Sequence, residues 1–145
     1  MIFLKNEQLY HETQIRVRYA ETDKMGYSYY GNYPTYYEVG RTEFLREMGL
    51  TYKSLEDDGY LLPIVSMSVK YIKPAVYDDL LTVRTYYKKI HSVKVDFDYE
   101  IFNQNNILIN TGTTLLAFVD INTRKPTQAP DIYLETLKKI WKKNK

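Results

Sequence analysis

Residues 19–33 hold an aspartate, Asp23, between an alternating apolar segment and the start of a predicted helix. A carboxylate can take a proton from water or attack an activated carbonyl group directly. The unpaired N–H groups at the start of a helix, together with the positive end of its dipole, can stabilise the negative charge that such a reaction develops. Spacing alone favours a structural role, because an aspartate followed three residues later by Gly26 is typical of a side chain that caps its own turn.

Other familiar catalytic groups are missing from the sequence. There is no cysteine, which excludes thiol nucleophiles, disulfides and cysteine-ligated metals. The nucleophile elbow, the phosphate-binding loops and the zinc-binding helix motif are absent as well. The two histidines, His11 and His91, lie at a predicted strand start and a predicted turn, where a lone histidine is usually a polar surface residue. The sequence therefore predicts neither a metal nor an organic cofactor.

The composition is that of an ordinary globular chain. Its 145 residues fit one domain, residues 1–145, and 44% hydrophobic with 26% charged residues argues against disorder. A net charge of +2 is too small to predict a nucleic-acid partner. The apolar run at the N-terminus is too short for a signal peptide, and no apolar stretch is long enough to span a membrane, so a cytoplasmic protein is expected. Sixteen tyrosines suit half-buried sheet faces and subunit interfaces.

Two elements should position Asp23. Apolar and polar residues alternate over residues 12–19, which predicts a half-buried strand before the turn. Over residues 32–48 the apolar spacing becomes three to four, which predicts a helix. Asn32 suits its N-cap, Pro34 its first turn and Gly49 its C-cap.

The rest of the chain reads as strands followed by a helix. A short helix is predicted at residues 51–58, and a C-terminal helix after Pro130 carries one apolar stripe. Four strands with hairpin-length connections are predicted at residues 64–72, 81–88, 93–101 and 107–120.

This order predicts an α+β protein with one antiparallel sheet. The sheet should curve around the helix of residues 32–48, which is the arrangement of the hotdog fold. Gly40 lies inside that helix at a cost of about 1 kcal/mol relative to alanine. We expect its missing side chain to permit close packing against the sheet.

The sequence YAETDKMGYSYYGNY of residues 19–33, with Glu38 and Arg41 on the helix after it, resembles the signature of the 4-hydroxybenzoyl-CoA thioesterase family. The likeness includes the short-chain acyl-CoA thioesterase branch of that family. Residues 73–75 (Lys-Pro-Ala) and the aspartate pair at 78–79 extend it over most of the chain.

The resemblance implies a role for each residue of the motif. The family aspartate falls on Asp23, which acts as nucleophile or as general base for water, depending on the member. The backbone N–H of Tyr30 is implied to hydrogen-bond the thioester oxygen, and this role does not depend on the histidine that the short-chain branch carries at that position. Tyr19 matches an aromatic position of the branch, and Gly31 would let a substrate approach the backbone closely.

Further charged residues are secondary candidates. Glu38 and Glu43 lie on the predicted helix, where another hotdog branch carries a carboxylate, and they are weaker candidates than Asp23. Arg41 lies three residues from Glu38, so an ion pair between these two is the simpler explanation for both. For the phosphates of CoA the sequence offers several basic residues on or beside strands, namely Arg84, Lys88, Lys70 and Lys73.

We therefore predict hydrolysis of an acyl-CoA to a carboxylic acid and CoA by a homodimer, or by a dimer of dimers, without metal or cofactor. An exposed sheet edge favours pairing between two copies, and hotdog sites lie between protomers. Two alternatives stay open: hydrolysis of acyl groups on acyl carrier protein, and a non-catalytic module that binds acyl-CoA or lipid. A hotdog dehydratase is disfavoured, because no histidine is placed to pair with the carboxylate.

Overall fold

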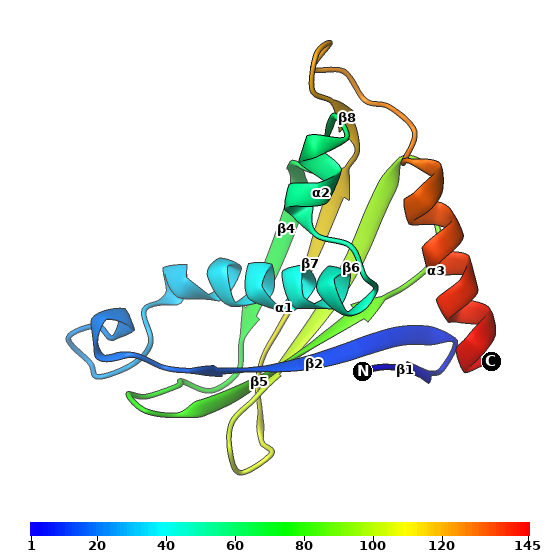
Figure 1. The fold of residues 1–145 in the computed structure, drawn as a ribbon. Helices are drawn as coiled ribbons and strands as arrows, with labels where there is room; N and C mark the ends of the chain where they lie inside the picture. The colour runs from blue at the N-terminus through cyan, green and yellow to red at the C-terminus, as the bar shows by residue number, and fades with distance from the viewer.

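The computed structural model describes all of residues 1–145, and its centre is one antiparallel sheet crossed by a long helix (Figure 1). Six strands form this sheet in the order β1-β2-β5-β6-β7-β4. The strands are β1 (Ile2–Lys5), β2 (Gln8–Arg16), β4 (Ile64–Tyr71), β5 (Leu80–Tyr87), β6 (Lys94–Phe102) and β7 (Leu108–Ala117). A small pair, β3 (Tyr60–Leu61) with β8 (Val119–Asp120), lies apart. The predicted α+β class, with one sheet around a helix, is confirmed.

The helices lie close to their predicted bounds. The α-helices are α1 (Tyr33–Glu47), α2 (Tyr52–Asp57) and α3 (Asp131–Asn144), and two 3-10 turns are η1 (Tyr19–Glu21) and η2 (Tyr30–Asn32). Pro34 occupies the first turn of α1, and Gly49 follows its end with a φ of +89°. None of the helices has the length and apolar character that a membrane crossing requires.

The first strand differs from its prediction. The structure adds β1, and β2 runs from Gln8 to Arg16 rather than over residues 12–19, so that Tyr19 falls in η1. His11 lies within β2 and is only 8% exposed, with its ring against Phe44. The expectation of a surface histidine is therefore wrong, because strand β2 is longer at its start and turns this side chain toward α1.

The connection from β4 to β5 is not a hairpin. Strand β4 pairs with β7 at one edge of the sheet, whereas β5 pairs with β2 and β6. Alternating residues indicate which face of a strand is buried but not which strand lies beside it, so the sequence pattern could not predict this crossover. Its consequence is that β4 becomes an edge strand.

Helix α1 contacts the sheet through its backbone at Gly40. A Cβ atom at residue 40 would lie 2.5 Å from Thr85 Oγ1 and 2.8 Å from Val83 Cγ1, far inside normal contact distance. The predicted close approach is confirmed. Gly112 in β7 likewise leaves room for the ring of Tyr37, which stacks on Tyr99 at 4.3 Å between ring centres.

Helix α3 closes one end of this core. Tyr133 and Leu137 are fully buried, and the Tyr133 ring meets Phe118 edge-on at 4.9 Å. The hydroxyl of Tyr133 also contacts that of Tyr87. The predicted apolar stripe of the C-terminal helix is thereby confirmed as its packing face.

Candidate functional site

Asp23 lies in a tight turn that its own side chain stabilises. The Asp23 N–H donates to the Tyr27 carbonyl at 2.8 Å, and the Asp23 carbonyl accepts from Gly26 N at 3.0 Å. Gly26 adopts a φ of +83°, which favours glycine. Asp23 Oδ1 accepts the N–H groups of Met25 and Tyr27 at 2.9 and 3.2 Å, while Oδ2 makes no hydrogen bond. One carboxylate oxygen therefore builds the turn and leaves the other free for chemistry.

The free side of this turn faces a cavity of about 270 Å³. The cavity lies between the turn, the start of α1 and the segment that follows β4. Its lining residues are Asp23, Met25, Tyr27, Ser28, Tyr30, Tyr33, Tyr71, Ile72, Lys73 and Pro74. Asp23 and Tyr30 thus share one small pocket with mostly aromatic and aliphatic walls.

The start of α1 offers unused donors beside the pocket. The N–H groups of Tyr29 and Asn32 donate to the carbonyls of Glu21 and Tyr29, whereas those of Tyr30 and Gly31 have no acceptor among the turn, loop and cap hydrogen bonds. Unpaired N–H groups at a helix start are suited to an anion or a developing oxyanion.

Asn32 occupies the N-cap position but does not cap the helix with its side chain. Its Nδ2 atom donates to the Glu21 carbonyl at 2.7 Å and to Ser28 Oγ at 3.3 Å. The predicted N-cap position is confirmed, and the side-chain amide of Asn32 ties the start of α1 to η1.

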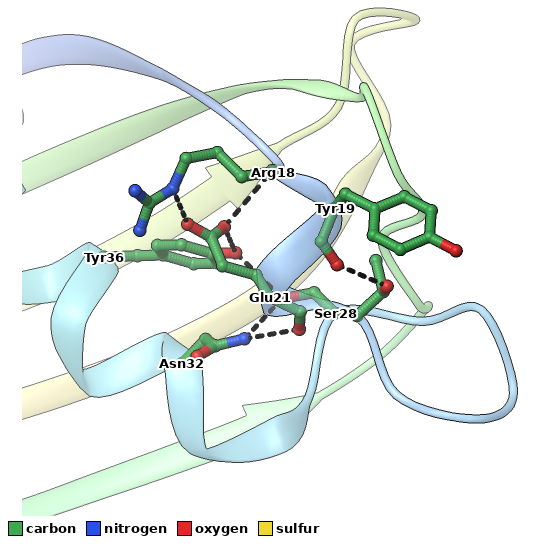
Figure 2. A network of polar contacts seen from close by, with 7 residues as sticks. Arg18, Tyr19, Glu21, Ser28, Asn32 and Tyr36 are labelled. Atoms are coloured by element: carbon green, nitrogen blue, oxygen red, sulfur yellow. Dashed lines mark hydrogen bonds and ion pairs between the residues drawn. The ribbon is translucent and has the colours of Figure 1, made fainter.

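A chain of hydrogen bonds behind the pocket is centred on Glu21 (Figure 2). Its carboxylate accepts the Arg18 guanidinium at 2.7 Å and the Tyr36 hydroxyl at 2.7 Å, and the Tyr36 oxygen lies 2.8 Å from Ser28 Oγ. Burial acts to raise the pKa of Glu21, but the hydrogen bonds from Arg18 and Tyr36 outweigh it and hold the pKa below its usual value. Neither Tyr36 nor Ser28 was predicted as part of the site, because neither hydroxyl lies at a motif spacing that is typical of catalysis.

The other motif residues lie around the pocket rather than in its wall. Tyr19 is 78% exposed and meets Tyr77 edge-on at 5.5 Å between ring centres. Gly31 lies under the ring of Tyr29, where a Cβ atom would come within 2.6 Å of that ring. Gly31 therefore contributes room and a free backbone donor.

The basic residues are divided between separate surfaces. Lys73 lines the pocket with Asp23. Lys70 instead lines a separate polar hollow of about 660 Å³, which is formed largely by sheet side chains that point away from α1. Arg84 is held at 2.8 Å from Glu12, and Lys88 lies 3.2 Å from Asp98. Of the four, only Lys73 is brought to the pocket.

The charged residues of α1 are arranged differently from the prediction. Arg41 is only 7% exposed and lies beside Tyr52 and Tyr99, and its Nε and Nη1 atoms have no hydrogen-bond partner. Glu38 is exposed, and Glu43 pairs with Arg46 at 3.4 Å. The predicted ion pair between Glu38 and Arg41 is wrong, because the two side chains point to opposite environments.

Comparison with known proteins identifies the family to which this chain belongs. The Thioesterase-like superfamily matches residues 17–137. YneP of Bacillus subtilis is 36% identical over 115 residues, which cover 79% of this chain and 83% of YneP. The acyl-CoA thioester hydrolase YbgC of Escherichia coli is 32% identical over 116 residues, which cover 80% of this chain and 87% of YbgC.

The fold is shared with solved thioesterases. A DHNA-CoA thioesterase from Staphylococcus aureus superposes with a TM-score of 0.87 at 35% sequence identity and covers 93% of each chain. The chloroplastic acyl-acyl carrier protein thioesterase ATL2 of Arabidopsis thaliana is 30% identical over 83% of this chain and 64% of its own length. This chain therefore belongs to the thioesterase-like superfamily and has its hotdog fold.

Proposed function

We propose that this protein hydrolyses an acyl-CoA thioester to the free carboxylic acid and CoA. The observation that carries the proposal is the shared pocket of Asp23 and Tyr30, because Asp23 has a carboxylate oxygen without a partner and Tyr30 has an unused N–H at a helix start. A thioester is an activated acyl group, so a carboxylate with preorganised oxyanion donors is sufficient for its hydrolysis. No step in this reaction needs a metal or an organic cofactor.

Two routes use the same geometry. As general base, Asp23 takes a proton from water, the hydroxide adds to the thioester carbon, and the oxyanion accepts the Tyr30 N–H. The tetrahedral intermediate then expels the CoA thiolate, which takes the proton from Asp23. As nucleophile, Asp23 forms a mixed anhydride and expels CoA, and water then cleaves the anhydride. Single turnover in H₂¹⁸O can reveal the nucleophilic route: attack of water on the Asp23 carbonyl of the anhydride leaves label in the protein, whereas the general-base route labels the acid product alone.

Substitution of Asp23 by asparagine tests the central residue. Asparagine keeps the side-chain oxygen that accepts the N–H groups of Met25 and Tyr27, so the turn should survive while turnover is nearly abolished. Asp120→Asn is the matched control, because Asp120 accepts two backbone N–H groups of its own turn and lies outside the pocket. Undiminished thiol release by Asp23→Asn would exclude the mechanism.

The pocket walls favour an aromatic acyl group. Four tyrosines, together with Met25 and Ile72, surround the cavity and suit a flat ring better than a flexible chain. The similar Staphylococcus protein acts on DHNA-CoA, which has an aromatic acyl group. Thiol release from acyl-CoAs of graded chain length and aromaticity should give the highest kcat/KM for aryl-CoAs, and a preference for long aliphatic chains would contradict this choice.

CoA is the proposed carrier of the acyl group, and Lys73 is the one cation among the residues that line the pocket. The likeness to ATL2 supports the second candidate, an acyl carrier protein donor. Steady-state rates with the same acyl group on CoA and on acyl carrier protein distinguish the two. Tight binding of acyl-CoA without thiol release would instead support a non-catalytic binding module.

We further propose that two copies of the chain pair through β4 in a homodimer, which could assemble into a dimer of dimers. Strand β4 is an unpaired edge with exposed apolar side chains, including Val65 at 60% and Met67 at 45% exposure. Its last residue, Tyr71, lines the pocket, so pairing would place a partner beside the site. Met67→Lys should give monomers by light scattering with lower activity, and unchanged dimers would contradict pairing along β4.

A cytoplasmic location is part of the same proposal. A chain without cysteine is compatible with a reducing compartment, and acyl-CoA is an intracellular substrate. Fractionation of the source cells would test it.

A further inference from the structure

We infer that Tyr71 is a positioning residue for thioester hydrolysis, because its hydroxyl holds the carbonyl of Tyr30, the residue whose N–H faces the reaction. This inference rests on the proposed function of the pocket. It adds a residue from the edge strand β4 to the pair of Asp23 and Tyr30.

The contact joins two distant parts of the chain. Tyr71 Oη donates to the Tyr30 carbonyl oxygen at 2.8 Å, across 41 residues of sequence. The Tyr71 ring meets the Tyr33 ring edge-on at 5.2 Å, which fixes the direction of its hydroxyl. Burial raises the pKa of Tyr71, so the phenol stays protonated and keeps its role as donor at neutral pH.

The local chain offers the Tyr30 carbonyl one donor only. Tyr30 begins the 3-10 turn η2, in which a carbonyl accepts the N–H three positions later, here that of Tyr33. The α-helical donor four positions later would be Pro34, which has no N–H. A carbonyl oxygen has two lone pairs, and Tyr71 donates to this one from the sheet.

Holding the carbonyl restrains the amides on both sides of it. The Tyr30 carbonyl shares one planar peptide group with the Gly31 N–H, and only φ and ψ of Tyr30 separate it from the Tyr30 N–H, which is free at the start of η2. A donor that already points at the developing oxyanion needs no rearrangement during the reaction, and removing one such donor costs about 10²- to 10³-fold in rate. Loss of the hydrogen bond that holds the donor should cost less, about tenfold, because the N–H itself remains.

The test compares Tyr71→Phe with wild type in steady-state hydrolysis of an acyl-CoA. We expect kcat to fall by about tenfold and KM to stay within about twofold, because the bond acts on the transition state. Binding of a non-hydrolysable thioether analogue of acyl-CoA, measured by calorimetry, should be unchanged. Tyr10→Phe is the control and should match wild type. Tyr10 lies on β2, outside the pocket, and its hydroxyl makes no hydrogen bond.

A second variant separates positioning from general damage. Pro34→Ala restores an N–H that can reach the Tyr30 carbonyl, so Tyr71→Phe should cost clearly less in the Pro34→Ala background than in wild type. An unchanged kcat in Tyr71→Phe would overturn the inference, as would an equal loss of kcat and analogue affinity, which would mean direct substrate contact. Equal losses in both backgrounds would also overturn it. A wild-type protein without hydrolysis would instead refute the proposed function.

Discussion

The hydroxyl of Tyr36 donates a 2.7 Å hydrogen bond to the carboxylate of Glu21. Because a phenol has one proton, the 2.8 Å contact between Tyr36 and Ser28 must then be donated by Ser28. Asn32 donates to the same serine oxygen. The ionised Glu21 carboxylate therefore sets the direction of the hydrogen bonds made by Tyr36 and Ser28.

Tyr36→Phe should destabilise the fold by about 1.5–3 kcal/mol, since it removes a hydrogen bond to a charged group and leaves Ser28 without its acceptor. The free energy of unfolding in urea measures this loss. Tyr60→Phe is the control, because the Tyr60 hydroxyl makes no side-chain hydrogen bond, and it should cost under about 0.5 kcal/mol. Equal stability of the two variants would mean that the network contributes nothing.

Acid should weaken this network in a defined pH window. The pKa of Glu21 lies below its ordinary value of 4.5 in the folded protein, so its ionised form contributes stability above pH 4.5 that is lost as the pH falls through the lowered pKa. Glu21→Gln should flatten the pH dependence of unfolding below pH 4.5. A variant with the wild-type acid slope would contradict the assignment.

His11 should produce a second window at higher pH. Burial, followed by the nearby N-terminal amine, lowers its pKa below the ordinary 6.5. Between the lowered value and 6.5 the unfolded chain binds a proton that the folded chain does not, so stability falls as the pH drops below 6.5. His11→Gln should remove this part of the slope in urea unfolding measured at successive pH values. An unaltered slope would show that other groups cause it.

Gly40→Ala should destabilise the protein although alanine favours helices. The gain in helix propensity is about 1 kcal/mol, whereas forcing a methyl group against Thr85 and Val83 costs about 1–3 kcal/mol and moves α1 off the sheet. Thermal unfolding should give a lower Tm than wild type, while the exposed control Glu38→Ala should not. A higher Tm for Gly40→Ala would mean that the helix can shift without loss.

The sequence predicted the helices and strands themselves better than it predicted which strands lie side by side in the sheet. Gly40 and the apolar stripe of α3 were predictable because helical spacing and an internal glycine depend on contacts along one element. The edge position of β4 was not predictable, since the residues of β7 that pair with it lie 39 (Tyr71 to Asn110) to 52 (Ile64 to Leu116) positions later in the chain. The same limit applies to the site: the motif pointed to Asp23, but Tyr71 reaches it only through the sheet order.

The side chains of α1 illustrate a second limit. The spacing of Glu38 and Arg41 is that of an ion pair, yet Arg41 is buried and Glu38 is exposed. A position on the helix surface does not reveal which side another helix will cover. Here α2, with Tyr52, covers Arg41.

Helix α3 carries the only tryptophan of the chain, Trp141, half-buried against the core and far in sequence from the pocket residues. Its fluorescence should therefore report whether the C-terminal helix is docked, and it should be insensitive to ligands at Asp23. The same signal would make undocking of α3 visible separately from unfolding of the sheet, which the tyrosines report.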